Sequence, residues 1–100
     1  MSLKLILSDE AVLDIEEAFL WYFEISPDIA DKFEKKIFTV LEQIQSHPEN
    51  FQTRYRNIKV RFLSKFPYGV HYLKKDSNTI IIVGVFHSSK DPKNWFDRIK

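Results

Sequence analysis

The chain has 100 residues, of which 44% are hydrophobic and 15% aromatic, which suits a single domain with one core and argues against global disorder. The absence of cysteine excludes disulfides and thiolate metal sites and is typical of a reducing compartment. No apolar run is long enough for a membrane span, and the run at residues 3–7 is too short for a signal peptide because Asp9 and Glu10 follow at once. We therefore expect one domain over residues 1–100, in the cytoplasm and without a membrane partner.

The net charge of +1 conceals a strong asymmetry between the two halves of the chain. Residues 1–50 hold 4 lysines and 11 acidic residues, a net charge of −7, whereas residues 51–100 hold 11 basic and 3 acidic residues, a net charge of +8. So basic a half favours an anionic partner. Alternatively, acidic helices and basic strands could attract one another within one fold.

The first half of the chain predicts a strand followed by a helix. Residues 3–7 form a short apolar run typical of a strand, and Ser8 can then accept hydrogen bonds from the free amides of a helix start. From there apolar residues recur at steps of three and four, as on one face of a helix of about four turns. This stripe comprises Ala11, Ile15, Ala18, Tyr22 and Ile25, widened by Val12, Phe19 and Phe23.

A second helix begins at Ser26-Pro27-Asp28, because serine caps a helix and proline fits its first position. His47-Pro48 ends this helix. The short connection between the two helices predicts an antiparallel hairpin, whose shared apolar seam must cover a further element. The second stripe comprises Ala30, Phe33, Ile37, Val40, Leu41 and Ile44.

The second half of the chain predicts three strands. Residues 58–63 and 68–73 alternate with a period of two, and Asp76-Ser77-Asn78 supplies a turn before the nearly continuous apolar run of residues 79–87. Such a run is typical of a central strand covered on both faces, of which the hairpin can cover one. Either the tail around Trp95-Phe96 or a partner chain would cover the other. The expected fold class is α+β: an N-terminal strand, an antiparallel helical hairpin packed on an antiparallel sheet of three further strands, and a short C-terminal tail.

The alternation along these strands also predicts a basic surface. If it holds across the sheet, five residues lie on the face opposite Val60, Val70 and Tyr72. These five are Lys59, Arg61, Gly69, His71 and Lys75. We expect them to form a basic face that is open to an anionic partner.

The order of the elements and several motifs resemble the RelE/ParE toxin superfamily over essentially the whole chain. Residues 66–72 (FPYGVHY), 80–87 (IIIVGVFH) and 90–92 (KDP) are similar to the family pattern FPY-x-x-x-Y … I-x-V … H-x-x-R-D-P. Residues 8–15 (SDEAVLDI) are similar to its A-x-x-D-I/L opening, and Arg61 lies where many members carry arginine. The resemblance implies the toxin of a type II toxin–antitoxin pair, of the ParE-like, plasmid-stabilisation type, which forms a hetero-oligomer with a cognate antitoxin that holds it inactive.

Members of this superfamily divide by target: some cleave mRNA on the ribosome, whereas ParE-like members poison DNA gyrase without cutting RNA. Gly69 stands where the ribosome-dependent nucleases carry a catalytic arginine. Lys90 replaces the arginine of the motif, which keeps the charge but loses the two-point grip on phosphate or carboxylate. No acidic base is evident among the strands, since Asp76 lies in a turn and Asp91 precedes Pro92.

The candidate site residues are basic, as binding or cleaving a phosphate chain requires. If the protein is an enzyme, the catalytic candidates are Arg61, His87 and Lys90. The residues expected to bind the target or the antitoxin are Lys59, Arg61, His71, His87 and Lys90. Each has a structural alternative: Arg61 could be a solvated strand residue, His71 a packed imidazole and His87 a turn residue. The three scattered histidines make no metal site, and no cofactor is implied.

We therefore expect a toxin that binds DNA gyrase and is not an enzyme. The alternatives are a ribosome-dependent mRNA endonuclease on the same fold and a degenerate member that only pairs with its antitoxin as a regulatory module. Gly69 favours the gyrase toxin over the nuclease, and the charge of +8 in the second half disfavours an inert module. We expect the antitoxin to bind near the central strand through a segment of acidic and apolar residues.

Overall fold

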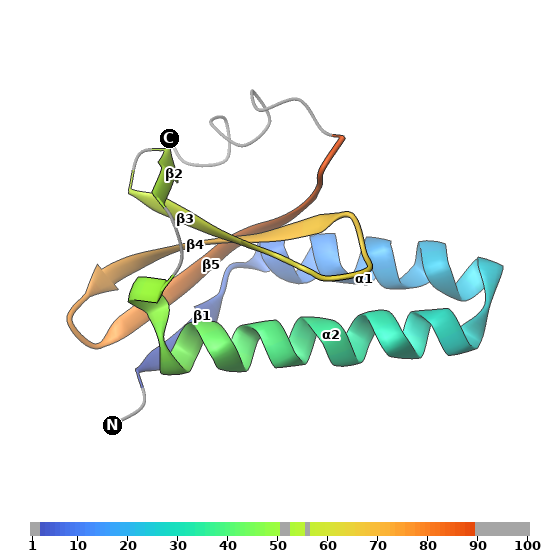
Figure 1. Ribbon diagram of the computed structural model, residues 1–100, viewed down its shortest axis with the longest axis horizontal. Coiled ribbons are helices and arrows are strands. Elements are labelled where there is room, and N and C mark those ends of the chain that lie inside the picture. Colours follow the sequence, from blue (N-terminus) through green and yellow to red (C-terminus); the bar gives the residue numbers. More distant parts are fainter. Residues whose placement is uncertain (1–2, 51–52, 56, 90–100) are drawn as a thin grey trace.

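The computed structural model describes residues 3–50, 53–55 and 57–89. This part of the chain forms two layers, a helical hairpin and a sheet, with both helices on one face of the sheet (Figure 1). The elements in chain order are β1 (Lys4–Leu7), α1 (Asp9–Ile25), α2 (Pro27–Ser46), the 3₁₀ turn η1 (Pro48–Asn50), β2 (Thr53–Tyr55), β3 (Ile58–Phe62), β4 (Tyr68–Asp76) and β5 (Thr79–His87).

The two helices begin and end at the residues that the sequence predicts. Ser8 Oγ accepts a hydrogen bond from the Ala11 N–H at 3.0 Å, and Ser26 Oγ accepts one from the Ile29 N–H at 3.5 Å. These bonds satisfy amides that a helix start otherwise leaves free. His47 caps the end of α2. Within the described ranges, neither helix is both long and apolar enough to cross a membrane.

The sheet has five strands in the order β1-β5-β4-β3-β2. β3, β4 and β5 form the antiparallel meander that the sequence predicts, and Asp76 Oδ1 accepts the Asn78 N–H at 2.8 Å in the turn between β4 and β5. This agrees with the expected α+β class, to which the structure adds two features. β1 pairs parallel with β5, so the sheet is mixed, and the short β2 adds a strand beside β3 that no apolar run in the sequence predicts.

The main core lies between the hairpin and the sheet. All six residues of the predicted α2 stripe are buried, which confirms the face assigned to this helix. At one end of the core, the ring centroids of Tyr22, Phe33, Phe66 and Tyr68 lie 5.3 to 6.3 Å from one another in the contacting pairs. The buried residues of this core are Ala11, Ala18, Phe33, Ile37, Val40, Leu41, Ile44, Leu63, Val70, Tyr72, Ile80, Ile82 and Val85.

The apolar stripe predicted on α1 is only partly buried. Ala11 and Ala18 are buried, whereas Val12, Phe23 and Ile25 remain 39%, 49% and 62% exposed. The reason is that α1 is apolar around more of its circumference than the sheet and α2 together can cover. The hairpin therefore presents apolar side chains to the outside.

The pairing of β3 with β4 places the basic residues on the helix side of the sheet. Lys59 pairs with Tyr72, and Arg61 pairs with Val70. Residues directly opposite one another on adjacent strands share a face. Because Val70 and Tyr72 belong to the core under the helices, Lys59 and Arg61 lie on that same face.

The opposite face of the sheet is apolar rather than basic. Val60 pairs there with His71, and a Cβ atom at Gly69 would meet Val60 Cγ1 at 3.0 Å. The predicted basic face, which grouped Lys59 and Arg61 with Gly69 and His71, is therefore wrong. The prediction that β5 is central and buried is confirmed, since it lies between β1 and β4. The tail considered as a cover for this apolar face lies outside the described residues.

Candidate functional site

Arg61 lies on β3 beside α2 and is partly buried. Its Nη1 donates to the Phe62 carbonyl at 3.2 Å, and its Nη2 donates to Gln43 Oε1 at 3.4 Å. The bond to Gln43 joins the sheet to the C-terminal half of α2. These contacts fix the guanidinium at the junction of the two layers, so Arg61 is not the freely solvated strand residue that the sequence leaves open.

Lys59 lies two residues before Arg61 on the same face, toward η1. It lines a hollow of about 220 Å³ together with Pro48, Glu49, Asn57, Tyr72 and Lys74. The Tyr72 hydroxyl donates to the Pro48 carbonyl at 2.6 Å at the base of this hollow. Burial raises the pKa of Tyr72 well above its ordinary value, and the Glu49 carboxylate raises it further. The lining of the hollow therefore combines the ammonium groups of Lys59 and Lys74 with a neutral hydroxyl.

His71 is only 1% exposed and lies on the apolar face of the sheet. Its ring packs edge-to-face on Phe86, with the ring centroids 4.8 Å apart and the planes at 87°. A buried imidazole in such a contact stabilises the apolar face and is not presented at the surface of the described part of the chain. Of the two readings of His71 in the sequence, the structure favours the packed imidazole.

His87 ends β5 and is half-buried beside α1. Its Nδ1 accepts the backbone N–H of Ser89 at 3.0 Å and lies 2.7 Å from Ser89 Oγ. Because an N–H donates to Nδ1, the neutral ring carries its proton on Nε2. The ring also lies edge-to-face against Tyr68, at 5.1 Å between centroids.

His87 contributes to a second hollow of about 200 Å³, which α1 closes on one side. Asp14 and Glu17 line it from α1, and Tyr68 lines it from β4. Burial raises the pKa of the Tyr68 hydroxyl, with further contributions from Tyr22 and from the Glu17 carboxylate. The hollow thus combines an imidazole, a neutral phenol and two carboxylates.

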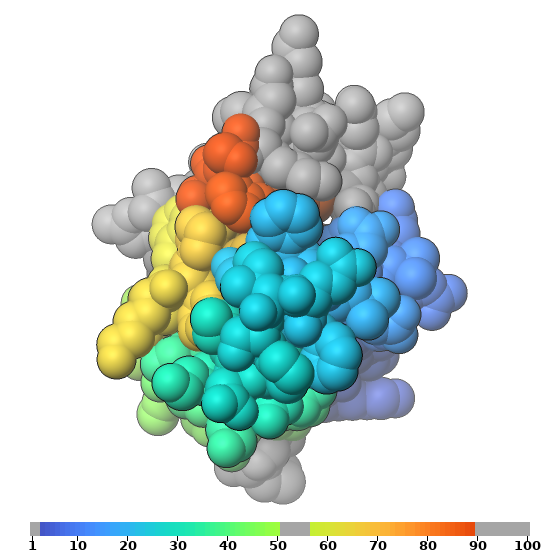
Figure 2. Space-filling view, turned by 90° about the vertical axis from the view of Figure 1, so that its right-hand side faces the viewer, coloured from blue at the N-terminus to red at the C-terminus, as the bar shows by residue number. Residues whose placement is uncertain are grey.

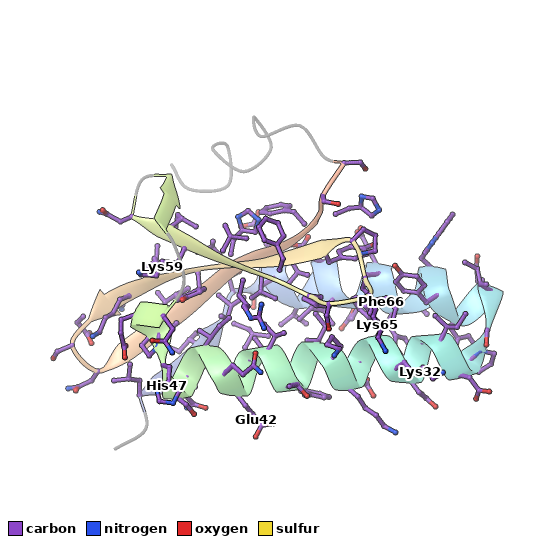
Figure 3. All side chains as sticks on the ribbon, viewed as in Figure 1. Lys32, Glu42, His47, Lys59, Lys65 and Phe66 are labelled. Atoms are coloured by element: carbon purple, nitrogen blue, oxygen red, sulfur yellow. The ribbon has the colours of Figure 1, made fainter. Side chains whose placement is uncertain are left out.

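The structure does not bring the predicted site residues together. Arg61 pairs with Val70 and Val70 pairs with Val85, so two strand spacings, about 10 Å, separate Arg61 on β3 from the β5 strand that carries His87. Lys59 lies toward the η1 end of the sheet (Figure 3). His71 is on the other face, and Lys90 lies outside the described residues. Within the described ranges, no three histidine or acidic side chains gather into a group that could hold a metal ion.

Two features that the sequence did not single out stand near these residues. Asp14 Oδ2 accepts the Val85 N–H at 2.9 Å and so attaches α1 to β5. Lys32, Lys35 and Lys36 on α2 line a hollow together with Lys65 from the connection between β3 and β4. The helical spacing of the first three lysines could have indicated from the sequence that they share one side of α2. The proximity of Lys65 to them depends on the fold and has no signal in the sequence.

Comparison with known proteins places this arrangement in a family. Residues 5–92 match the family described as the ParE toxin of the type II toxin–antitoxin system parDE. A solved structure titled "Chromosomal ParDE TA system from P. aeruginosa" has a similar fold, with a TM-score of 0.75 and 17% sequence identity over 85% of this chain and 95% of that chain. The curated protein sequences contain no match. Because the family match spans most of its length, the chain belongs to the ParE toxins of type II toxin–antitoxin systems, within the RelE/ParE superfamily.

Proposed function

We propose that this toxin acts in the cytoplasm by binding DNA gyrase, that it does not cleave RNA, and that a cognate antitoxin neutralises it by covering apolar surface on the hairpin. The observation that carries the proposal is the separation of the candidate catalytic residues. Cleavage of RNA requires a base at the 2′-hydroxyl, an acid at the leaving oxygen and cations over the phosphorane, all within hydrogen-bond reach of one phosphate. Arg61 and His87 belong to strands about 10 Å apart. The Arg61 guanidinium donates to Gln43 on α2, so the two side chains are not directed at one common site.

The position of Gly69 supports the same conclusion. A Cβ there would meet Phe62 Cδ1 and Val60 Cγ1, both at 3.0 Å, so a larger side chain would not fit without a shift. Its backbone also pairs with Phe62 and Phe86 on the apolar face, away from Arg61. An arginine at position 69 would therefore not join Arg61 in one cationic cluster. Binding needs only charge and shape complementarity, which separated residues can provide.

The apolar surface of the hairpin supports the antitoxin part of the proposal. Of nine large apolar side chains that are exposed among the described residues, seven lie on α1 or α2. Hollows along the outer seam of the hairpin are lined by Val12, Ile15, Leu20 and Phe38, with Glu16 and Glu34 beside them. A contiguous exposed apolar surface of this kind is typical of a protein interaction site. An antitoxin segment that supplies apolar side chains fits this seam.

The hollow at His87 favours a second candidate function. It places Glu17, Tyr68 and His87 around one space, and such groups can act as general acid and base. A ribosome-dependent endonuclease centred on His87 would use these residues rather than Arg61. This candidate predicts a loss of activity in His87→Ala that gyrase binding does not require.

The two functions are separated by controlled expression of the toxin in growing bacteria. Gyrase binding predicts growth arrest with DNA-damage signalling and loss of plasmid supercoiling, while mapped 5′ ends show intact mRNA. Arg61→Ala should weaken the arrest, whereas Lys75→Ala, an exposed control, should not. Cuts at codon-defined positions in translated mRNA, abolished by His87→Ala and accompanied by normal supercoiling, would contradict the proposal and establish the nuclease.

A further inference from the structure

Four lysines from two separate elements gather around one hollow of about 380 Å³. Lys32, Lys35 and Lys36 come from α2, and Lys65 comes from the connection between β3 and β4. In Figure 2 this connection, in yellow, lies beside the teal part of α2. Figure 3 labels Lys32, Lys65 and Phe66 where the two elements meet. We refer to these four lysines as the lysine cluster.

The spacing on α2 explains why the cluster is cationic. Residues three and four apart share one side of a helix, which places Lys32, Lys35 and Lys36 together. Asp28 and Asp31 stand one helical turn before Lys32 and Lys35, whereas Glu42 points away from the sheet (Figure 3). Within the described parts of the chain, none of the four ammonium groups forms an ion pair with a carboxylate. Internal pairing therefore does not neutralise this part of the surface.

Holding the four lysines close together has a cost for the isolated fold. Like charges one helical turn apart, such as Lys32 and Lys36, repel each other. Lys65 also adopts a φ of 70°, a left-handed conformation that glycine enters more easily than any residue with a side chain. Lys65 therefore brings a fourth ammonium group to the three on α2 from a backbone conformation that is strained for a residue with a side chain.

We propose that the lysine cluster binds the phosphate backbone of duplex DNA. Lysines act on phosphates as point charges, whereas lysine is depleted and arginine enriched at the centres of protein–protein interfaces. Among the described residues, the one ring that lines the hollow is Phe66, which is half-buried and packs on Tyr22 and Phe33. It is therefore not a platform for unstacked bases, as binding of a single strand would require. This inference does not depend on which target the toxin inhibits.

The proposal is tested with a fluorescent 20-base-pair duplex of arbitrary sequence and the full-length toxin, by anisotropy at several KCl concentrations. Contact with four phosphates predicts that log K falls with log [KCl] with a slope of about −3 to −4. Lys32→Ala/Lys36→Ala should lower the slope by about 2 and the affinity by about tenfold at low salt. Lys4→Ala/Lys75→Ala removes the same charge from two exposed residues near the β4–β5 turn and should leave the slope unchanged.

Lys65→Gly provides a second test in which the fold is not weakened. Glycine relieves the left-handed strain, so the variant should melt at or above the temperature of the parent while its salt slope falls by about 1. Three results would overturn the proposal: a parent slope near zero, an equal loss of binding in Lys4→Ala/Lys75→Ala, or tighter binding of single-stranded RNA or poly-glutamate than of the duplex. The last result would reassign the lysine cluster to another class of partner.

Discussion

Phe33 is fully buried where the hairpin meets the sheet. Its ring contacts Tyr22 from α1 and both Phe66 and Tyr68 from the sheet side, at centroid distances of 5.3 and 5.4 Å. One side chain thus links both helices to the end of β4. Phe38, on the same helix, is 58% exposed and has no such role.

Phe33→Ala should lower the free energy of unfolding by about 3–5 kcal/mol, because it removes a large buried side chain and leaves a cavity. Phe38→Ala should lower it by less than about 1 kcal/mol. Chemical denaturation of both variants measures the difference. Equal stability of Phe33→Ala and the parent would show that Phe33 does not lie on the buried face of α2.

Tyr72 makes stability depend on alkaline pH. Its buried hydroxyl donates to Pro48, and its pKa is raised, so the folded state keeps a proton that the unfolded state releases near pH 10. This contribution to stability is fully present below about pH 10 and is lost as the pH rises above it.

Tyr72→Phe should lower the free energy of unfolding by about 1–3 kcal/mol at pH 7, because the Pro48 carbonyl loses its donor. The same variant should lose less stability than the parent between pH 9 and pH 11. Urea denaturation at a series of pH values tests both statements. A parent whose stability is constant up to pH 11 would disprove the role of the buried hydroxyl.

Which side chains face the helices was the part of the site that the sequence could not determine. Both faces of β3 and β4 carry apolar residues, so alternation alone does not identify the core face. In the observed register of β3 and β4, Val60 lies opposite His71 and not opposite Val70. Relative to the predicted arrangement this is a shift of one residue, and it places Arg61 on the helix side of the sheet. The residue types therefore predicted the candidate site residues. The register of β3 against β4 determines which face of the sheet each of them occupies.

At the level of elements, the start of α1 provides hydrogen-bond partners for the backbone of β5 beyond the end of β1. β1 pairs with β5 only as far as Leu7 opposite Ile82. Beyond that point the Ser8 N–H donates to the Ile82 carbonyl at 3.0 Å, and Asp14 accepts the Val85 N–H at 2.9 Å. The start of α1 thus satisfies backbone groups of a central strand that no further strand covers.

Asp14→Ala should lower the free energy of unfolding by about 1.5–3 kcal/mol, the range for a hydrogen bond to a charged group. Asp14→Asn keeps an acceptor and should cost less. Glu17→Ala, one turn away on the same helix, is the control and should have little effect. If Asp14→Ala and Glu17→Ala unfold at the same denaturant concentration, the bond to Val85 does not hold α1 on the sheet.

The helices and strands could be predicted because their boundaries depend on neighbouring residues. The pairing of distant strands could be predicted less well. Ser8, Ser26 and His47 mark the helix boundaries because capping depends on neighbouring residues. The parallel pairing of β1 with β5 joins residues about 75 positions apart, and short apolar strands carry no signal of direction. The irregular register after His71 also depends on the assembled sheet.

At the level of the whole molecule, apolar and basic surfaces lie in different places. The outer seam of the hairpin is apolar with acidic residues beside it, and the lysine cluster lies where α2 meets the β3–β4 connection. Separate surfaces allow the antitoxin and an anionic partner to be bound by different residues.

Saturating antitoxin should raise the apparent melting temperature, because a ligand that binds only the folded state adds about 2.7 kcal/mol at 100 times its Kd. Leu20→Ala/Phe38→Ala should weaken this binding, whereas Phe62→Ala, which removes an exposed ring on β3, should not. Thermal melts with and without the antitoxin give the comparison. An unchanged melting temperature, or equal affinity for both variants, would exclude the hairpin seam as the antitoxin site.

The central claim, inhibition by binding without cleavage, is tested most directly with purified components. The toxin is added to DNA gyrase acting on relaxed plasmid and, in parallel, to ribosomes translating a defined mRNA. Binding without cleavage predicts a dose-dependent loss of supercoiling, weakened in Arg61→Ala and in Lys90→Ala with the fold intact, and full-length mRNA at every dose. Cleaved mRNA with unaffected supercoiling would contradict it.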